Sequence, residues 1–260
     1  MNKRILITGM GVVSAIGNDV AENYDSLRKG KSGICRVQYL DTEHTEFPVG
    51  EVKLSNEELC QALNIPYTNM ESRTDLLGML AVREALLSAA LIDAKHLALI
   101  SGTTVGGMDR TEKFYPDNLN AVILGNHDCG SGTDRIADYF GNFDFATTIS
   151  TACSSALNAI IVGAEMIEAG LKDIVVVGGT ESLSRFHLNG FKSLMILDQN
   201  ICRPFNADRA GLNLGEGAGF LVIESEDSAK KRGANVLAEL KGTGNACDAY
   251  HQTASSENGE

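Results

Sequence analysis

The sequence lacks any run of Lys or Arg that could neutralise a line of nucleic-acid phosphates. It has 22 basic and 34 acidic residues among 260, which gives a formal net charge of −12 at pH 7. No window approaches the roughly 18 consecutive apolar residues of a membrane-spanning helix. The composition therefore excludes a membrane span and argues against a nucleic-acid partner, while a hydrophobic content of 43% predicts a large core.

Paired cysteines are also missing. The chain has six cysteines without a C-x-x-C motif, at Cys35, Cys60, Cys129, Cys153, Cys202 and Cys247. A chain of this length does not need disulfides for stability, so we expect reduced thiols in a cytoplasmic protein. Cys247 and His251 have a ligand-like spacing, but no second pair completes a tetrahedral metal site. No metal is therefore predicted.

Strand-like and helix-like patterns alternate along the chain. Strands are expected at residues 5–8, 97–102, 173–178, 220–224 and 236–241. Helices are expected at residues 19–28, 73–91, 154–169 and 225–231. This alternation predicts an α/β protein with a mostly parallel central sheet. No linker divides the chain, so residues 1–260 are expected to form one unit, although its polar tail ends without a closing helix.

One cysteine stands at the joint between a strand and a helix. The stretch FATTISTACSSALNAIIVGAEMI, residues 145–167, passes through T-A-C-S-S into a pattern that is apolar around almost its whole circumference, which predicts a buried helix. Cys153 then lies at the helix N-terminus, where partial positive charge favours a thiolate and free amides can stabilise an oxyanion. The other five cysteines have no such setting in the predicted elements. These residues alone leave a nucleophile and a buried structural cysteine equally open, since no histidine lies nearby in sequence.

Six sequence blocks stand in order along the chain. One is T-A-C-S-S-A at 151–156, and the others are ITGMGVVSAIG at 7–17, SGTTVGG at 101–107, VVVGGTES at 175–182, RPFNADRAGLNLGEGAGFLVIE at 203–224 and DAYHQTA at 248–254. Together they resemble the β-ketoacyl-acyl carrier protein synthases, the condensing enzymes of fatty acid and polyketide synthesis, and the first block is similar to the active-site signature of that family. The resemblance implies a thiolase-like fold. Residues 1–260 would be a β-ketoacyl synthase N-terminal domain, the first half of a duplicated layered sheet-helix architecture.

The resemblance implies a 3-oxoacyl-[acyl carrier protein] synthase, an acyltransferase without a cofactor of its own. Cys153 would be the nucleophile and a backbone oxyanion donor, and it would accept an acyl group from the phosphopantetheine of acyl carrier protein. The acyl group would then pass to a carbanion made by decarboxylation of malonyl carrier protein. A homodimer is also implied, in which the strand near residues 146–150 pairs with its counterpart.

The family's decarboxylation residues have no counterpart in this sequence. Two histidines, a lysine and a Gly-Phe-Gly-Gly turn of the family would lie beyond residue 260. We therefore expect the chain alone to self-acylate at most slowly and to form no β-ketoacyl product. The loop at 197–205 is shorter than in many of the family's fatty acid enzymes and lacks their basic residue, with Gln199 in its neighbourhood. Segment 71–80 keeps only Arg73 of a stretch that is often more basic in the family. Candidate substitutes for docking the acidic carrier protein are Lys192, Arg185, Arg110 and Lys113.

Three other functions remain open. A non-catalytic partner similar to the chain-length factors is disfavoured because those proteins lack the cysteine that this chain has at 153. A thiolase-type enzyme would use CoA without decarboxylation, and the R-P-F and D-A-Y-H blocks argue against it. The third alternative is a dimerisation unit without turnover.

Two glycine-rich stretches partly match known nucleotide- and phosphate-binding motifs, and His251 could be taken for a catalytic base. Residues 9–14 lack the third glycine of a dinucleotide-binding turn, and residues 215–219 are not followed by the Lys-Ser/Thr of a phosphate loop. Close backbone packing is the predicted use of the second glycine group. His251 is expected to be structural, and no role is predicted for the remaining histidines.

Overall fold

A six-stranded sheet forms the centre of the computed structural model, which describes residues 4–247, 249–251 and 256–258. The strands are β1 (Ile5–Ser14), β2 (Leu97–Gly102), β3 (Phe143–Ile149), β4 (Ile174–Glu181), β5 (Gly217–Ser225) and β6 (Ala238–Leu240). The helices are α1 (Val20–Arg28), α2 (Asn56–Leu63), α3 (Arg73–Ser88), α4 (Met108–Phe114), α5 (Ala121–Gly125), α6 (Cys129–Phe140), α7 (Ser155–Glu168), α8 (Arg185–Ser193) and α9 (Glu226–Arg232). No helix in these described ranges is both long enough and apolar enough to span a membrane.

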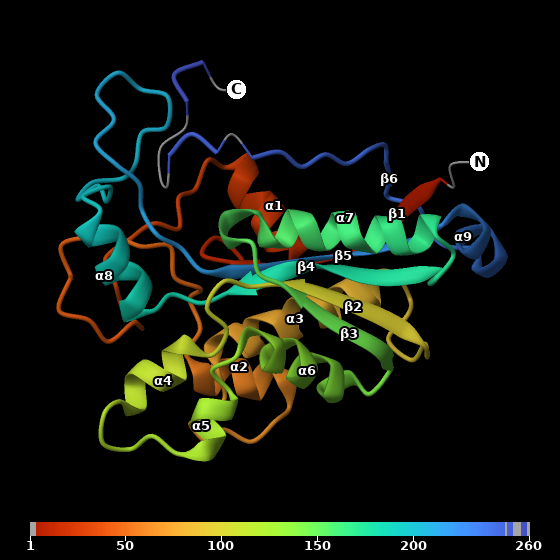
Figure 1. Cartoon of the computed structure of the whole chain (residues 1–260), viewed down its shortest axis with the longest axis horizontal. Coiled ribbons are helices and arrows are strands. Elements are labelled where there is room, and N and C mark those ends of the chain that lie inside the picture. The colour runs from red at the N-terminus through yellow and green to blue at the C-terminus, as the bar shows by residue number, and fades with distance from the viewer. Residues whose placement is uncertain (1–3, 248, 252–255, 259–260) are drawn as a thin grey trace.

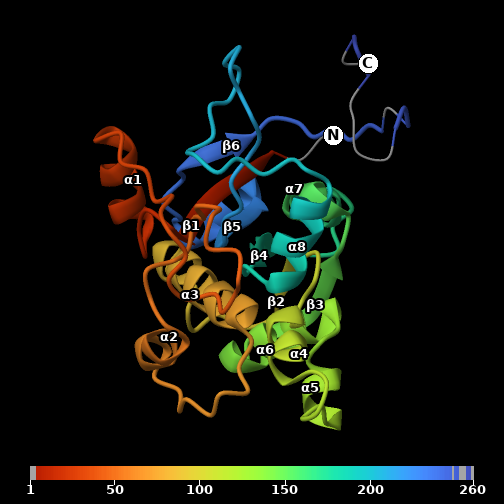
Figure 2. The same cartoon turned by 90° about the vertical axis from the view of Figure 1, so that its left-hand side faces the viewer.

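Helices cover both faces of the sheet and make three layers (Figure 1). Helix α7 lies on one face, against β2, β3, β4 and β5, while α3 packs on β1, β4 and β5 from the other face and α6 packs on β3. Figure 2 shows the same layers from the side, with α3 and α7 separated by the sheet. Helices α4, α5 and α8 gather near the end at which β4 terminates (Figure 1). This arrangement confirms the predicted α/β class.

The sheet is mixed, so the prediction of a mostly parallel sheet is wrong. The strand order is β3-β2-β4-β5-β1-β6. Only the β2–β3 and β2–β4 pairs are parallel, whereas β5 is antiparallel to β4 and β1, and β6 is antiparallel to β1. The segment after β4 returns to the end of the sheet that β4 leaves, since Glu181 pairs with Gly217. Without a crossover to the opposite end, β5 must run antiparallel.

Strand β1 continues well past the predicted residues 5–8, as far as Ser14. Its middle is covered by α3, and the contact is close: a Cβ placed on Gly11 would lie 2.1 Å from the carbonyl oxygen of Ala81. A side chain at this position would therefore push α3 away from the sheet. Residues 9–14 serve strand and helix packing and do not form the turn of a dinucleotide-binding motif.

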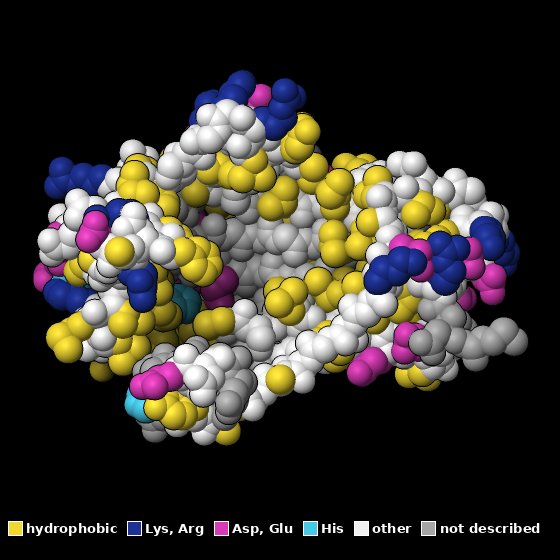
Figure 3. Space-filling view, turned by 90° about the horizontal axis from the view of Figure 1, so that it is seen from above, with side chains coloured by type: hydrophobic (Ala, Val, Ile, Leu, Met, Phe, Trp, Pro, Cys, Tyr) yellow, Lys and Arg dark blue, Asp and Glu magenta, His cyan; other side chains and the backbone are white. Residues whose placement is uncertain are grey.

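Helix α7 is not buried on all sides, contrary to the prediction from its sequence. Ala159, Gly163 and Ile167 face the sheet and are buried, but Leu157 on the opposite side is 65% exposed. Only one sheet lies against α7 in the described residues, so its second apolar face has no cover there. Figure 3 looks onto this side of the molecule and shows hydrophobic side chains gathered around a hollow.

Asp75, a buried carboxylate on α3, makes the protein's free energy of unfolding depend on pH. Asp75 accepts hydrogen bonds from Arg135 through Oδ2, but its Oδ1 has no partner in the described structure. Burial raises the pKa of Asp75 to about 6, with Arg135 opposing the shift. Because the folded pKa exceeds the usual 3.8, the folded state binds more protons between these values, and stability falls as pH rises through that window.

We expect Asp75→Asn, which mimics the protonated acid, to remove the fall in stability that ionisation of Asp75 causes as pH rises. The variant's free energy of unfolding, relative to that of the unchanged chain, should rise by about 2 kcal/mol between pH 4 and pH 7.5. Urea unfolding at both pH values measures the difference. An equal pH dependence in the two proteins would show that the pKa of Asp75 is the same in the folded and the unfolded chain.

Candidate active site

Cys153 lies in a single turn of 3₁₀ helix, Ala152–Ser154, between the end of β3 and the start of α7. Ser155 closes this turn, because its Oγ accepts from the amide of Thr151 at 2.9 Å and donates to the carbonyl oxygen of Ala152 at 2.7 Å. Ala152 itself has a φ of 53°, a left-handed conformation that costs a residue with a Cβ roughly 1–2 kcal/mol. The predicted sharp joint is therefore present, and its backbone strain falls on the residue before the cysteine.

Small residues let the first turn of α7 lie directly on the sheet. A Cβ on Gly102, the last residue of β2, would lie 2.5 Å from the backbone nitrogen of Ala156 and 2.5 Å from the carbonyl carbon of Ser155. On β4, a Cβ on Gly179 would lie 2.8 Å from the Cβ of Ala156. The ends of β2 and β4 thus fix the position of the turn that carries Cys153.

The Cys153 side chain is exposed and opens onto a shallow depression of about 300 Å³. No described carbonyl accepts from the amide N–H of Cys153, so that donor remains available beside the thiol. The depression is lined by the ends of β2, β4 and β5 and includes Thr104 and the carboxylate of Glu181. No histidine is among its described lining residues. The arrangement offers a nucleophile and an oxyanion donor on one residue.

Two further cysteines have settings that the predicted elements do not indicate. Cys129 is the first residue of α6, so Cys153 is not alone near a helix N-terminus, and Lys53 Nζ lies 2.9 Å from Cys35 Sγ. Burial, followed by the nearby carboxylate of Glu181, raises the pKa of Cys129. Burial also raises the pKa of Cys60 to about 11. Both effects disfavour the thiolate, whereas Cys153 is exposed.

Limiting iodoacetamide near neutral pH should alkylate Cys153 first and Cys60 last. A pKa of about 11 instead of 9.0 leaves Cys60 with roughly a hundredfold less thiolate, and burial slows it further. Peptide mapping against time gives the order for all six cysteines. Faster labelling of Cys35, the thiol beside Lys53, would contradict the ranking.

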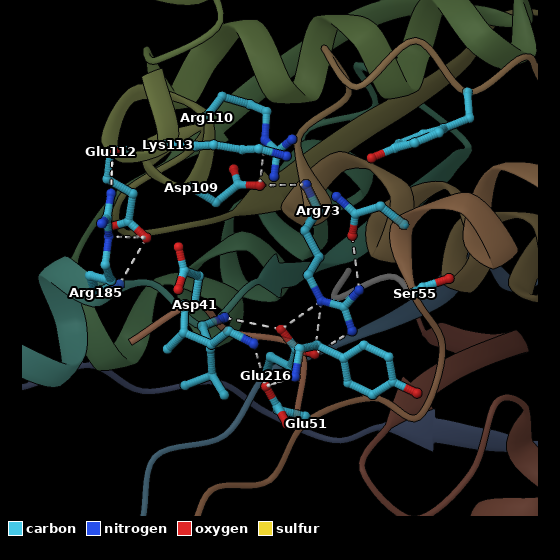
Figure 4. Close-up of a pocket in the computed structure, with 15 residues that line it drawn as sticks. Asp41, Glu51, Ser55, Arg73, Asp109, Arg110, Glu112, Lys113, Arg185 and Glu216 are labelled. Carbon is cyan, nitrogen blue, oxygen red and sulfur yellow. Dashed lines mark hydrogen bonds and ion pairs between the residues drawn. The ribbon is translucent and has the colours of Figure 1, made fainter. Parts of the chain in front are cut away.

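Another cleft, of about 310 Å³, lies beside α4 and α8 and is lined by many charged residues (Figure 4). Its charges pair with one another: Arg73 binds Glu216 at 2.6 Å, and Arg110 binds Asp109 at 2.9 Å. Glu216 also accepts from the amides of residues 52 and 183. The Arg73–Glu216 pair joins α3 to the residue before β5, and the Arg73 amide donates to Asp109 on α4, so these buried charges serve the fold.

The four basic residues predicted to dock a carrier protein differ in exposure. Arg110 is buried against Asp109, and Arg185 hydrogen-bonds to Glu112. Lys113 and Lys192 are exposed, and Lys113 lies at the charged cleft with its Nζ 2.6 Å from the Asn69 side-chain oxygen. Only Lys113 and Lys192 are therefore well placed to meet an acidic partner.

The sequence block at 248–254 is only partly visible, because residues 248 and 252–254 lie outside the described residues. Cys247 and His251 are described and exposed, and nothing tests the structural role expected for His251. No group of three or more His, Cys, Asp or Glu side chains in the described ranges is arranged to hold a metal ion.

Comparison with known proteins agrees, over most of the chain, with the family resemblance of the sequence blocks. Residues 2–229 match the family model described as beta-ketoacyl synthase, N-terminal domain. The chain is 33% identical to 3-oxoacyl-[acyl-carrier-protein] synthase 2 of Staphylococcus aureus strain COL over 287 aligned residues, which cover 100% of this chain and 66% of that protein. The chain thus spans about two thirds of the length of such curated relatives.

Solved structures share the architecture. The ishigamide ketosynthase/chain length factor superposes with a TM-score of 0.90 at 31% identity, covering 100% of this chain and 67% of that one. A type II PKS ketosynthase in complex with its acyl-carrier protein superposes with a TM-score of 0.82 at 25% identity, covering 98% and 66%. Both similarities extend over the sheet, α3 and α7, and they confirm the predicted thiolase-like architecture.

Proposed function

Because the chain belongs to the β-ketoacyl synthase family, we propose that it supplies the nucleophile of a 3-oxoacyl-[acyl carrier protein] synthase. The observation that carries this proposal is the placement of Cys153, whose exposed thiol lies at a sharp strand-to-helix turn. In the described residues, no backbone carbonyl accepts a hydrogen bond from the amide N–H of Cys153. The product belongs to fatty acid or polyketide synthesis.

The first chemical step is acyl transfer to sulfur. The Cys153 thiolate attacks the carbonyl carbon of an acyl thioester, and the oxyanion that forms accepts a hydrogen bond from the Cys153 amide. The C–S bond to the phosphopantetheine thiol then breaks, and that thiol leaves with the electron pair. In the second step, decarboxylation of a malonyl thioester gives a carbanion that attacks the Cys153 thioester, so a C–C bond forms while the Cys153 thiolate leaves.

Acyl carrier protein is the proposed partner, and its phosphopantetheine carries the substrate, so the chain needs no cofactor for the first step. Lys113 and Lys192 are the exposed cations that support carrier docking. The proposed location is the cytoplasm, where six free thiols remain reduced.

Two alternatives make different predictions. A non-catalytic partner would not acquire an acyl group, and a thiolase-type enzyme would prefer acyl-CoA. Incubation of the chain with acyl carrier protein thioester or with acyl-CoA, followed by intact-mass spectrometry, separates these cases. Faster acylation from the carrier thioester supports the proposal, and no mass gain from either donor contradicts it.

The edge of the sheet at β3 is the proposed dimer contact. β3 pairs only with β2 in the described sheet, and Phe145 on it is 41% exposed. Such an edge can pair with its counterpart across a two-fold axis.

We expect a homodimer at micromolar concentration that Phe145→Lys dissociates, because the substitution places two like charges near the two-fold axis. Light scattering measures the mass. Phe186→Lys is the matched control, since Phe186 is 56% exposed on α8 and away from β3. A monomeric unchanged chain, or equal masses for both variants, would contradict the β3 contact.

A further inference from the structure

A carboxylate at the end of β4 reaches the loop that follows β2. The two strands are parallel, and β4 continues past Gly179, the partner of the last β2 residue Gly102, as far as Glu181. Glu181 accepts from the hydroxyl of Thr103 at 2.9 Å and from the amide of Thr104 at 2.5 Å. Short hydrogen bonds to a carboxylate are among the stronger ones in proteins. Glu181 therefore fixes the two residues that leave β2.

The same two residues contact both sides of the turn that carries the nucleophile. The amide of Thr103 donates to the carbonyl oxygen of Ile149, the last residue of β3, at 3.2 Å. The hydroxyl of Thr104 donates to the carbonyl oxygen of Ala152 at 3.4 Å. These are bonds from the sheet to the turn, whereas the hydrogen bonds made by Ser155 lie within the turn itself.

The carbonyl oxygen of Ala152 and the amide N–H of Cys153 belong to one planar peptide group. In a trans peptide they point in opposite directions, and the Ala152–Cys153 bond is not cis. A hydrogen bond that fixes the carbonyl therefore also fixes the direction of the N–H. Ala152 has a φ of 53°, a strained conformation that the surrounding structure must hold. Its carbonyl oxygen also accepts from the Ser155 hydroxyl at 2.7 Å, so the bond from Thr104 is the one that ties this peptide to the sheet.

We infer that Glu181 is a positioning residue for acyl transfer: through Thr104 it fixes the Ala152–Cys153 peptide so that the Cys153 N–H points at the developing oxyanion. This inference rests on the proposed function of Cys153. In this role Glu181, which also lines the depression beside Cys153, acts through the loop after β2. Neither Glu181 nor Thr104 is singled out by the sequence blocks that contain them.

Two reactions of the same sulfur test the inference. Alkylation by iodoacetamide needs the thiolate but no oxyanion donor, whereas acylation from a thioester needs both. We expect Glu181→Ala and Thr104→Val to lower the rate of acylation about tenfold in the full chain, with the alkylation rate of Cys153 changed less than twofold. Glu181→Gln should keep most of the acylation rate, since its amide oxygen can accept from the Thr104 amide and the Thr103 hydroxyl can turn to accept from its NH₂.

The matched control is Glu51→Ala. Glu51 is also a carboxylate that accepts from loop amides, those of residues 38–40, but it lies outside the depression beside Cys153. Its loss should leave the ratio of acylation to alkylation unchanged. If Glu181→Ala also leaves this ratio unchanged, or lowers both rates alike, the inference is overturned.

A measurement independent of activity separates this inference from the proposed function. In protein labelled with ¹⁵N-cysteine, the Cys153 amide resonance is identified by its absence from the Cys153→Ala variant. Glu181→Ala should shift or broaden that resonance and leave those of Cys60 and Cys202 in place. An unmoved Cys153 resonance refutes the positioning role. If the unchanged chain takes no acyl group, the proposed function fails, and this resonance alone decides whether Glu181 holds the peptide.

Discussion

Cys153→Ala should abolish acylation of the chain, lowering its rate at least about a thousandfold, to the limit of detection by intact-mass spectrometry. The structure gives the reason: Cys153 alone combines an exposed thiol with the turn that β3 feeds into α7. Alanine keeps the backbone, including the amide of residue 153, so the substitution removes only the sulfur. A loss of acylation therefore reports the nucleophile and not the oxyanion donor.

The matched control is Cys129→Ala. Cys129 also begins a helix, but burial and the nearby carboxylate of Glu181 raise the pKa of its thiol. The variant should acylate at a rate within about twofold of the unchanged chain. If Cys153→Ala still gains the acyl mass and Cys129→Ala does not, the nucleophile has been assigned to the wrong helix.

The joint at Cys153 was predictable because its determinants are local. The residues T-A-C-S-S are small, the preceding run is β-branched, and the following run has helical periodicity. The helix starts at Ser155, one residue from the predicted start, and β2 spans the predicted residues 97–102. The start of α2 also had a local signal, the S-x-x-E capping box that Ser55 and Glu58 form, although the predicted elements omit this helix.

Features that depend on distant contacts could not be predicted in the same way. The antiparallel direction of β5 depends on where the segment after Glu181 returns to the sheet. The bond between Glu181 and the Thr104 amide joins residues 77 positions apart, and nothing in either local sequence indicates it. The exposed side of α7 has the same origin, because periodicity shows that a face is apolar but not which element covers it.

Gly102 lies where β2 contacts the first turn of α7, close to Cys153. A larger side chain at this position should therefore lower both stability and acylation. In Gly102→Val, the new Cβ would lie 2.5 Å from backbone atoms of Ser155 and Ala156, and backbone cannot yield as a flexible side chain can. The first turn of α7 must then move off β2 and take Cys153 with it. We expect the free energy of unfolding to fall by about 3 kcal/mol and the rate of acylation by at least about a hundredfold.

Urea unfolding and mass-spectrometric acylation measure the two effects on the same samples. Gly190→Ala in α8 is the matched control, because nothing lies within 4 Å of a Cβ placed there. An alanine inside this helix should raise the free energy of unfolding by about 0.5–1 kcal/mol and leave acylation unchanged. If Gly102→Val remains as stable and as readily acylated as the unchanged chain, the contact between β2 and α7 does not position Cys153. The rate of acylation would then not depend on how the end of β2 packs against α7.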